Sequence, residues 1–216
     1  MRFKCLMCGS CCTKSPISIL PHEDFTLRAL ADKYDVKYSS YPGYRVYDSQ
    51  NRIYIALSYV IDTNTGACPF LSGNKCLIHY EYKPLICRSF PYVPIKVSYH
   101  IIPELKIIHA KSEYRISLLC NFVKNNEDKL RELAEKTNGA ILHVIFEEQI
   151  RSAIEMDSIR NTLLNLLSTL WRRNDVDIVE DIDTGAPVVN LYDVLRMKFP
   201  ELPYVLGINK ILNRIT

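Results

Sequence analysis

The spacing of the cysteines constrains this chain more than any other feature. Four of its eight cysteines lie within the first dozen residues, in the pattern Cys5-x2-Cys8-x2-Cys11-Cys12. Two residues between thiols allow a tight turn to direct both sulfurs at one metal ion. Gly9 suits such a turn, because glycine reaches positive φ without strain. These N-terminal thiols need partners from elsewhere in the chain to complete a metal site.

Three further cysteines, Cys68, Cys76 and Cys87, can supply those partners from a proline-rich stretch. The turn-forming residues Ser72–Lys75 would fold Cys76 back towards Cys68 as a hairpin. Because proline interrupts regular structure, we expect short turns here and at most one helical turn before Cys87. A stretch of this kind forms no large core of its own, and a bound metal is a natural reason for it to be ordered. We therefore expect a metal to join it to the N-terminal cysteines.

Disulfides and inert buried thiols are the alternatives to metal binding. The chain of 216 residues is much longer than the small secreted domains that depend on disulfides. The basic residues Arg2 and Lys4 are not followed by the apolar run of a secretory signal peptide. Cytosolic thiols are normally kept reduced, with the intracellular proteins of hyperthermophiles as an exception. We therefore expect a cytoplasmic, metal-binding protein.

The composition argues against two classes of partner. The chain is 48% hydrophobic and 24% charged, as in an ordinary soluble protein, and it has no run of 18 apolar residues that could span a membrane. Its formal charge of +3 is small, and its basic residues are scattered among acids rather than gathered on one face. We expect neither a membrane nor a nucleic-acid partner, and the sequence indicates no particular protein partner or substrate.

The hydrophobic pattern predicts an α+β fold with a small antiparallel sheet followed by a mainly helical region. Residues 44–47, 52–59 and 95–102 alternate as strands. A helix is expected to start near Ser112, and a long helix to cover residues 140–173 with a break around residues 156–158. A further short helix is expected over residues 205–215.

This pattern suggests two parts. Residues 1–120 would form a loop-rich, cysteine-cluster metal-binding domain, and residues 121–216 a helical C-terminal region without cysteine. The second part carries long amphipathic stripes that can bury a core without a metal.

Four histidines, His79, His100, His109 and His143, are isolated in the sequence. None has the paired spacing, such as His-x3-His, that is typical of a metal site on a helix. Each is therefore interpreted as structural, and His79 is the best candidate ligand because it lies three residues after Cys76. The sequence also lacks the glycine-rich motifs of nucleotide-binding loops.

The combined cysteine pattern resembles the YkgJ-like cysteine-cluster family, whose members are usually described as zinc- or iron-chelating. The resemblance covers roughly residues 3–94. Lys83 stands where the family usually has arginine, and His79 where it often has tyrosine; neither change affects the thiol pattern. The matching residues are Cys5, Cys8, Cys11, Cys12, Cys68, Phe70, Leu71, Cys76, Ile78, Pro84, Cys87, Arg88, Phe90 and Pro91.

The resemblance implies two classes of function. The first is a metal-binding protein whose centre has a structural or redox role. The second is an enzyme that uses the centre, because the resemblance includes the flagellin lysine methylases and so implies methyl transfer to protein lysines as one chemistry. The sequence offers no independent sign of a methyl-donor site, and no catalytic residue is assigned.

The number of thiols leaves the metal open between zinc and an iron–sulfur cluster, because both accept four thiolates. Adjacent cysteines point in different directions along the backbone, so Cys11 and Cys12 are easier to reconcile with several metal atoms than with one ion. The N-terminal run also lacks the fourth thiol of the ferredoxin pattern at position 15, so iron–sulfur is favoured only slightly. The expected ligands, of which the last lies outside the resemblance, are Cys5, Cys8, Cys11, Cys12, Cys68, Cys76, Cys87 and Cys120.

A cluster of thiolates also requires positive charge nearby. Burying the net negative charge of four thiolates around a metal is costly without a cationic or hydrogen-bonding partner. Arg88 directly follows a ligand, so we expect its guanidinium to fold back towards the thiolates, with Lys83 as a second candidate.

Overall fold

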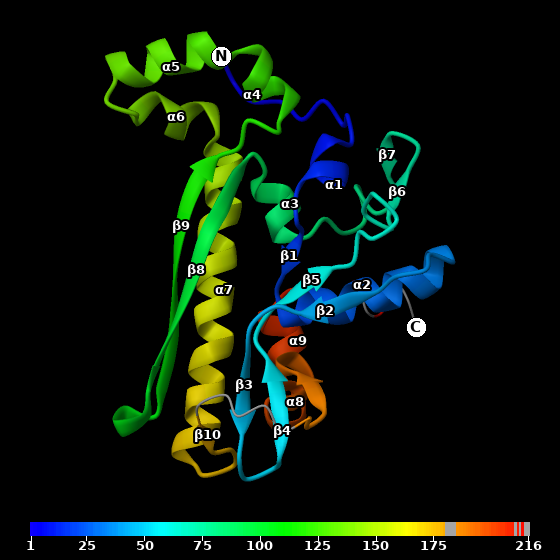
Figure 1. The fold of residues 1–216 in the computed structure, drawn as a ribbon, viewed down its shortest axis with the longest axis vertical. Helices are drawn as coiled ribbons and strands as arrows, with labels where there is room; N and C mark the ends of the chain where they lie inside the picture. Colours follow the sequence, from blue (N-terminus) through cyan, green and yellow to red (C-terminus); the bar gives the residue numbers. More distant parts are fainter. Residues whose placement is uncertain (180–184, 210, 212, 214–216) are drawn as a thin grey trace.

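A long helix with a hairpin along it forms the frame of the molecule (Figure 1). The structure is a computed structural model that describes residues 1–179, 185–209, 211 and 213. The helix is α7 (Glu147–Arg172), and the antiparallel hairpin consists of β8 (Tyr92–Ile102) and β9 (Ile107–Ile116), joined by the short helix η1 (Pro103–Leu105). The backbone amides of Ile108 and Ala110 donate to Ser168 and Asn161 of α7, each across 2.9 Å.

The helix expected to start near Ser112 is therefore wrong, because this residue lies inside strand β9. Ser112 pairs with Val97 of β8, and its hydroxyl donates to Asp157 of α7 across 2.7 Å. A strand is more stable than a helix here because β8 satisfies the backbone hydrogen bonds of β9. Alternate residues of β9, such as Ile108 and Ala110, are at the same time buried against α7. The strand predicted at residues 95–102 is confirmed and is longer than expected.

Two small sheets pack beside this frame. The first has the order β1 (Ser18–Ile19), β5 (Tyr59–Ile61), β2 (Ser40–Pro42), and all of its pairs are antiparallel. The second has the order β10 (Ile178–Val179), β3 (Arg45–Asp48), β4 (Ile53–Ala56), β11 (Val188–Asn190). In this sheet β11 runs parallel to β4, whereas β10 and β3 are antiparallel to their neighbours.

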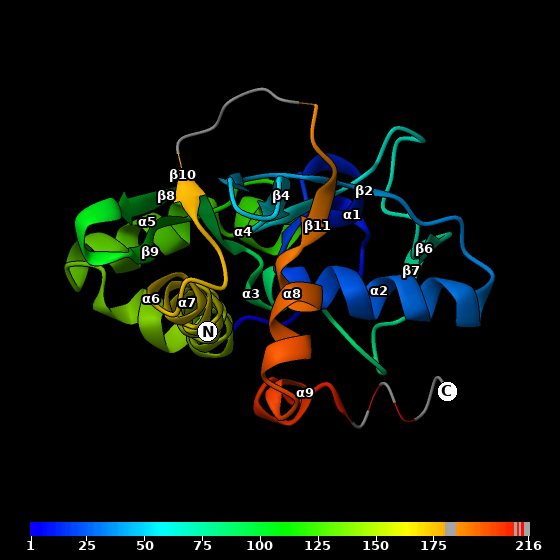
Figure 2. The ribbon, with the colours of Figure 1, turned by 90° about the horizontal axis from the view of Figure 1, so that it is seen from below.

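The main hydrophobic core joins distant parts of the chain. Val46 and Ile55 of the β3–β4 hairpin share it with Leu167 and Trp171 of α7 and Leu195 of α8 (Leu191–Lys198). Figure 2 shows β11 and α8 beside the strands and helix of the N-terminal half. A second core lies around α2 (Pro21–Tyr34), β1 and β5, and it extends to Phe70 and Leu85 near the cysteines. The division of the chain at residue 120 thus stays a prediction, although the main core draws on both sides of it.

A small helical cap covers the N-terminal end of α7 (Figure 1). It consists of α4 (Asn121–Asn125), α5 (Glu127–Lys136) and α6 (Ala140–Ile145). The rings of Phe122 and Phe146 pack on Phe3, with centroid distances of 5.1 and 5.6 Å. The backbone amide of Phe3 donates to Ile145 across 3.0 Å. The cap therefore fixes the start of the chain directly before its first cysteine.

The break expected near residues 156–158 occurs instead at Phe146, between α6 and α7. The fully buried Phe146 anchors the cap core, whereas Met156 continues along α7 without interruption. After α8 comes the short helix α9 (Leu202–Val205), and the helix expected over residues 205–215 lies partly outside the described residues. The overall class is α+β, as predicted. Within the described residues, no helix has the length and apolar character needed to cross a membrane.

Candidate metal centre

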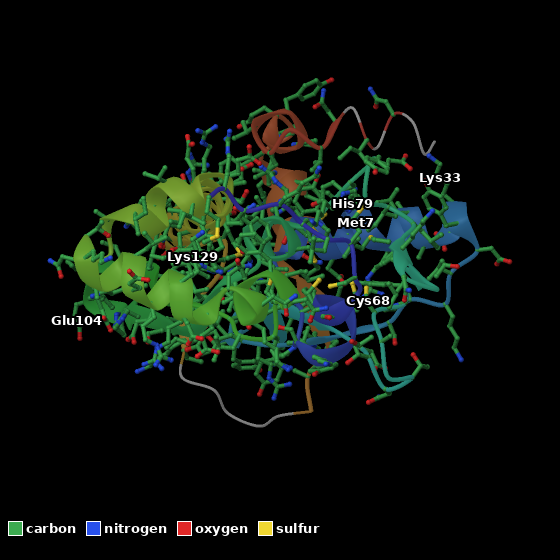
Figure 3. The ribbon with its side chains drawn as sticks, turned by 90° about the horizontal axis from the view of Figure 1, so that it is seen from above. Met7, Lys33, Cys68, His79, Glu104 and Lys129 are labelled. Carbon is green, nitrogen blue, oxygen red and sulfur yellow. The ribbon has the colours of Figure 1, made fainter. Side chains whose placement is uncertain are left out.

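All eight cysteines line a single cavity of about 80 Å³. Figure 3 shows sulfur atoms gathered beside Cys68. The cysteines come from five places in the fold: the N-terminal segment, helix α1 (Ser10–Lys14), the hairpin of β6 (Leu71–Ser72) and β7 (Lys75–Cys76) with the turn before it, helix α3 (Leu85–Ser89) and the residue that precedes α4. All eight thiols are free, so the structure contains no support for the disulfide alternative.

The backbone brings the two cysteine segments together. The amide of Cys68 donates to the carbonyl of Cys12 across 2.8 Å. Helix α1 begins after Gly9, which has φ 72° and whose carbonyl accepts from the amide of Cys12 across 2.9 Å. The turn predicted around Gly9 is therefore present, and it places Cys11 and Cys12 on a short helix that faces Cys68.

The second segment also folds as its turn residues predict. β6 (Leu71–Ser72) and β7 (Lys75–Cys76) form a two-stranded hairpin, in which Leu71 is paired with Cys76. The amide of Leu71 donates to Cys68 across 2.9 Å, so both cysteines lie at the base of the same hairpin. The single helical turn expected before Cys87 is α3, and Cys87 lies in it.

The thiols fall into two neighbourhoods. Cys11, Cys12, Cys68, Cys76 and Cys87 form the five-thiol group, in which the sulfurs of Cys11 and Cys12 are 3.9 Å apart. Cys5, Cys8 and Cys120 form the three-thiol group: burial raises the pKa of Cys120, and the neighbouring Cys8 and Cys5 raise it further. The negative charge of Cys11 opposes the lowering of the pKa of Cys8 by its hydrogen bonds with Ser10, so the two groups are adjacent.

The protonation of the five-thiol group is uneven. Burial raises the pKa of Cys68 to about 11 and raises the pKa of Cys87 well above its ordinary value. The hydrogen bond from Cys12 lowers the pKa of Cys11 to about 6, and the same bond raises the pKa of Cys12. A thiolate is thus favoured at Cys11, whereas the other thiols must lose protons to bind a metal.

The cation beside the thiols is Lys83 rather than Arg88. Burial raises the pKa of Cys76 and Cys87, and the positive charge of Lys83, which lines the cavity, partly opposes that rise. Arg88 instead forms an ion pair of 2.7 Å with Glu155 of α7, and its side chain is 44% exposed. The expectation for Arg88 is therefore wrong, because successive residues of α3 point in different directions and only Cys87 faces the cavity.

The donor set fits a thiophilic metal. Free thiols in an apolar cavity suit both zinc and iron–sulfur clusters. Within the described residues, no three Cys, His, Asp or Glu side chains stand ready to hold an ion without rearrangement. Side-chain rotation of the thiols would therefore accompany binding. His79 also lines the cavity, with its ring edge-on to Tyr80 at 4.8 Å.

One positioning residue escaped the sequence analysis. Glu23 of α2 is fully buried, and its two carboxylate oxygens accept from the backbone amides of Leu85 at 2.6 Å and Leu20 at 2.9 Å. It therefore holds the first turn of α3, two residues before Cys87. An acid in the first turn of a helix is ordinarily interpreted as a capping residue, so the sequence carried no signal for this contact with α3.

Comparison with known proteins identifies the class. Residues 4–131 match the family CxxCxxCC, described as "Putative zinc- or iron-chelating domain". The match covers more than half of the chain, and the chain therefore belongs to this family. It extends past the stretch on which the resemblance was based and includes Cys120 and α4. No curated protein and no solved structure matches the chain.

Proposed function

We propose that this protein coordinates an iron–sulfur cluster, or alternatively zinc, through all eight of its cysteines, with a structural or redox role. The observation that supports the proposal most strongly is the convergence of eight free thiols from distant segments on one cavity. Cysteines without a shared role would not be expected to line the same cavity from segments so far apart in the sequence.

The arrangement favours more than one metal atom. A single zinc takes four ligands, whereas the five-thiol group already exceeds that number and the three-thiol group lies beside it. The separation of 3.9 Å between the sulfurs of Cys11 and Cys12 is close to that of two thiolates on one tetrahedral ion, so the number of thiols, rather than this distance, favours several metal atoms. When bound, an iron–sulfur cluster would supply electron transfer, and zinc would supply structural cross-linking.

The surrounding residues are suited to retain such a centre. Phe70 and Ile78 line the cavity and are almost fully buried, which limits the access of water. Lys83 offsets part of the thiolate charge, and its long apolar stem can pack along the cavity wall. The backbone of α1 and α3 fixes the direction of three thiols, those of Cys11, Cys12 and Cys87.

Analysis of protein purified without oxygen tests the proposal. We expect iron and acid-labile sulfide with a brown absorption, or zinc in colourless protein. Cys12→Ser and Cys87→Ser should each lose most of the bound metal. Thr13→Ala changes an exposed neighbour on the same helix α1 and should retain it. Fully reduced protein that binds neither metal would refute the proposal.

An enzymatic use of the centre is the second candidate, and one observation favours it. A pocket of about 310 Å³ lies against α3, lined by Leu85 and Arg88, and Lys83 lines both this pocket and the cysteine cavity. A substrate in this pocket would lie close to the metal centre. Methyl transfer to protein lysines, in the manner of the flagellin lysine methylases, would appear as a mass gain of one methyl group in a lysine-rich acceptor incubated with S-adenosylmethionine. Incubation with the Cys87→Ser variant is the control.

A further inference from the structure

The hairpin places two exposed histidines face to face, far from the cysteines. His100 of β8 and His109 of β9 are directly paired across the strands, and both side chains are exposed. Their ring centroids are 4.9 Å apart, with an angle of 15° between the ring planes. Figure 3 shows Glu104, at the tip of this hairpin, on the opposite side of the molecule from Cys68. The pair thus lies outside the metal centre described above.

Neither imidazole contributes to the core that holds the hairpin on α7. The face of the hairpin turned to α7 carries Tyr99, Ile108 and Ala110, whereas the histidines lie on the other face. Within the described residues, neither imidazole makes a side-chain hydrogen bond or an ion pair, and each ring contacts the other. Their nitrogens are consequently available to an external ligand.

The geometry of a paired position suits a metal ion. Residues directly opposite one another in an antiparallel pair have Cβ atoms about 4.5–5.5 Å apart. Imidazole nitrogens bind zinc at about 2.0–2.1 Å, and rotation about the side-chain torsions can direct one nitrogen of each ring at a shared ion. Both rings start from the same strand pair, so the backbone is already organised for chelation.

We propose that His100 and His109 form a second metal site, for a divalent transition-metal ion that prefers nitrogen ligands. Imidazole suits zinc and nickel, whereas magnesium and calcium prefer oxygen. No third Cys, His, Asp or Glu among the described residues completes the site, so water fills the remaining positions. The site has only two protein ligands and is open to solvent, so it binds more weakly than the group of eight thiols and exchanges its ion more readily.

Nickel binding to the holo protein tests this site, because Ni²⁺ does not oxidise thiols as Cu²⁺ does. Affinity is measured by calorimetry at pH 7.5, and the ring proton signals of the histidines are followed by NMR. Two ligands on one scaffold act together, so His100→Ala and His109→Ala should each weaken the binding by about tenfold or more. One ring cannot chelate alone. The double variant should therefore bind Ni²⁺ with nearly the same affinity as either single variant.

His143→Ala is the matched control, because His143 is an exposed histidine on helix α6 and lies outside the paired strands β8 and β9. It should leave the affinity unchanged, and Ni²⁺ should broaden the ring signals of His100 and His109 before those of His143. Circular dichroism checks that the variants remain folded. The proposal would be overturned if all three single variants lowered the Ni²⁺ affinity equally. It would also be overturned if the losses of affinity from His100→Ala and His109→Ala were additive in the double variant, because the histidines would then bind independently. Release of the resident metal without broadening of these two rings would overturn it as well.

Discussion

The carboxylate of Glu23 accepts a hydrogen bond of 2.6 Å from the backbone amide of Leu85. This contact joins two elements that are 62 positions apart in the sequence, and it does so inside the protein, where Glu23 is fully buried. The other carboxylate oxygen accepts from the amide of Leu20 at the start of α2. One side chain thus satisfies the first turns of both helices and fixes the direction in which α3 presents Cys87.

Glu23→Gln should therefore destabilise the protein and weaken its hold on the metal. Glutamine keeps one oxygen acceptor but turns an NH₂ group towards the other amide, which leaves a buried donor unpaired. We expect a loss of about 1–3 kcal/mol in the free energy of unfolding, measured with urea. Metal content should fall in parallel. Glu104→Gln, an exposed acid on η1, is the control. If Glu23→Gln changes neither the free energy of unfolding nor the metal content, α3 is held in place by other contacts.

His22, the neighbour of Glu23, predicts a pH dependence of stability. Burial lowers the pKa of His22 to about 3, and among the described residues its Nδ1 has no hydrogen-bond partner. In the unfolded chain the pKa is about 6.5, so below that pH the unfolded state takes up a proton that the folded state does not. Stability is thus fully present above the unfolded pKa and decreases as the pH falls.

Between pH 7.5 and pH 5.5 the contribution of His22 should decrease by about 1.4 kcal/mol. His22→Leu should remove this part of the pH dependence, whereas His143→Ala, at an exposed histidine, should retain it. Urea denaturation of the three proteins at both pH values measures the difference. Parallel pH curves for wild type and His22→Leu would exclude His22 as the titrating group.

The local turns of the cysteine segments were predictable because their signals are local. Cysteine spacing and Gly9 indicated the N-terminal turn, and residues Ser72–Lys75 indicated the hairpin that brings Cys76 towards Cys68. Glycine at positive φ and polar residues at a turn act through the neighbouring backbone, so no knowledge of the fold is needed to interpret them.

Features that depend on a distant partner were not predictable in the same way. Ser112 lies in a strand because β8 pairs with it, and His100 meets His109 because η1 sets the register of the hairpin. The break at Phe146 depends on Phe3, from the other end of the sequence. Helix and strand propensities of such segments are close enough for tertiary contacts to decide between them.

Lys83 and Arg88 form a natural pair for testing charge at the thiols. Lys83 lines the cysteine cavity, whereas Arg88 is bound to Glu155 outside it. Lys83→Met keeps most of the side-chain volume but removes the charge, and it should weaken metal binding by about tenfold. Arg88→Met should change metal affinity little, because an exposed ion pair contributes only about 0–1 kcal/mol to stability. Competition with a chromophoric chelator measures both affinities.

The reverse order of effects would place the electrostatic support on Arg88, as the sequence first suggested. Equal, small effects would show that backbone amides and solvent balance the thiolate charge without a dedicated cation. A Lys83→Arg variant should restore most of the affinity, since a guanidinium in the same place supplies the same charge.

Metal removal should loosen the cysteine segments and leave the frame of the molecule protected. None of the five residues of α1, all of them described, is buried, and β6 and β7 contribute two residues each. These segments have little hydrophobic contact of their own, and a structural metal can supply on the order of 10 kcal/mol. Hydrogen exchange of the holo and metal-free proteins should therefore show loss of protection in residues 5–14 and 71–76, whereas Phe70 and Leu85 are held by the second core.

In the same experiment β8, β9 and α7 should keep their protection, because they bury a shared core without cysteine. The informative region is the β3–β4 hairpin, which lies before residue 120 in the sequence but packs against Leu167 and Trp171 of α7. We expect it to stay protected with the helices, so that the metal-dependent part is smaller than residues 1–120. Loss of protection throughout residues 1–120 would instead support the two-part division predicted from the sequence. Equal loss in every segment would show that the metal centre and the frame unfold as one cooperative unit.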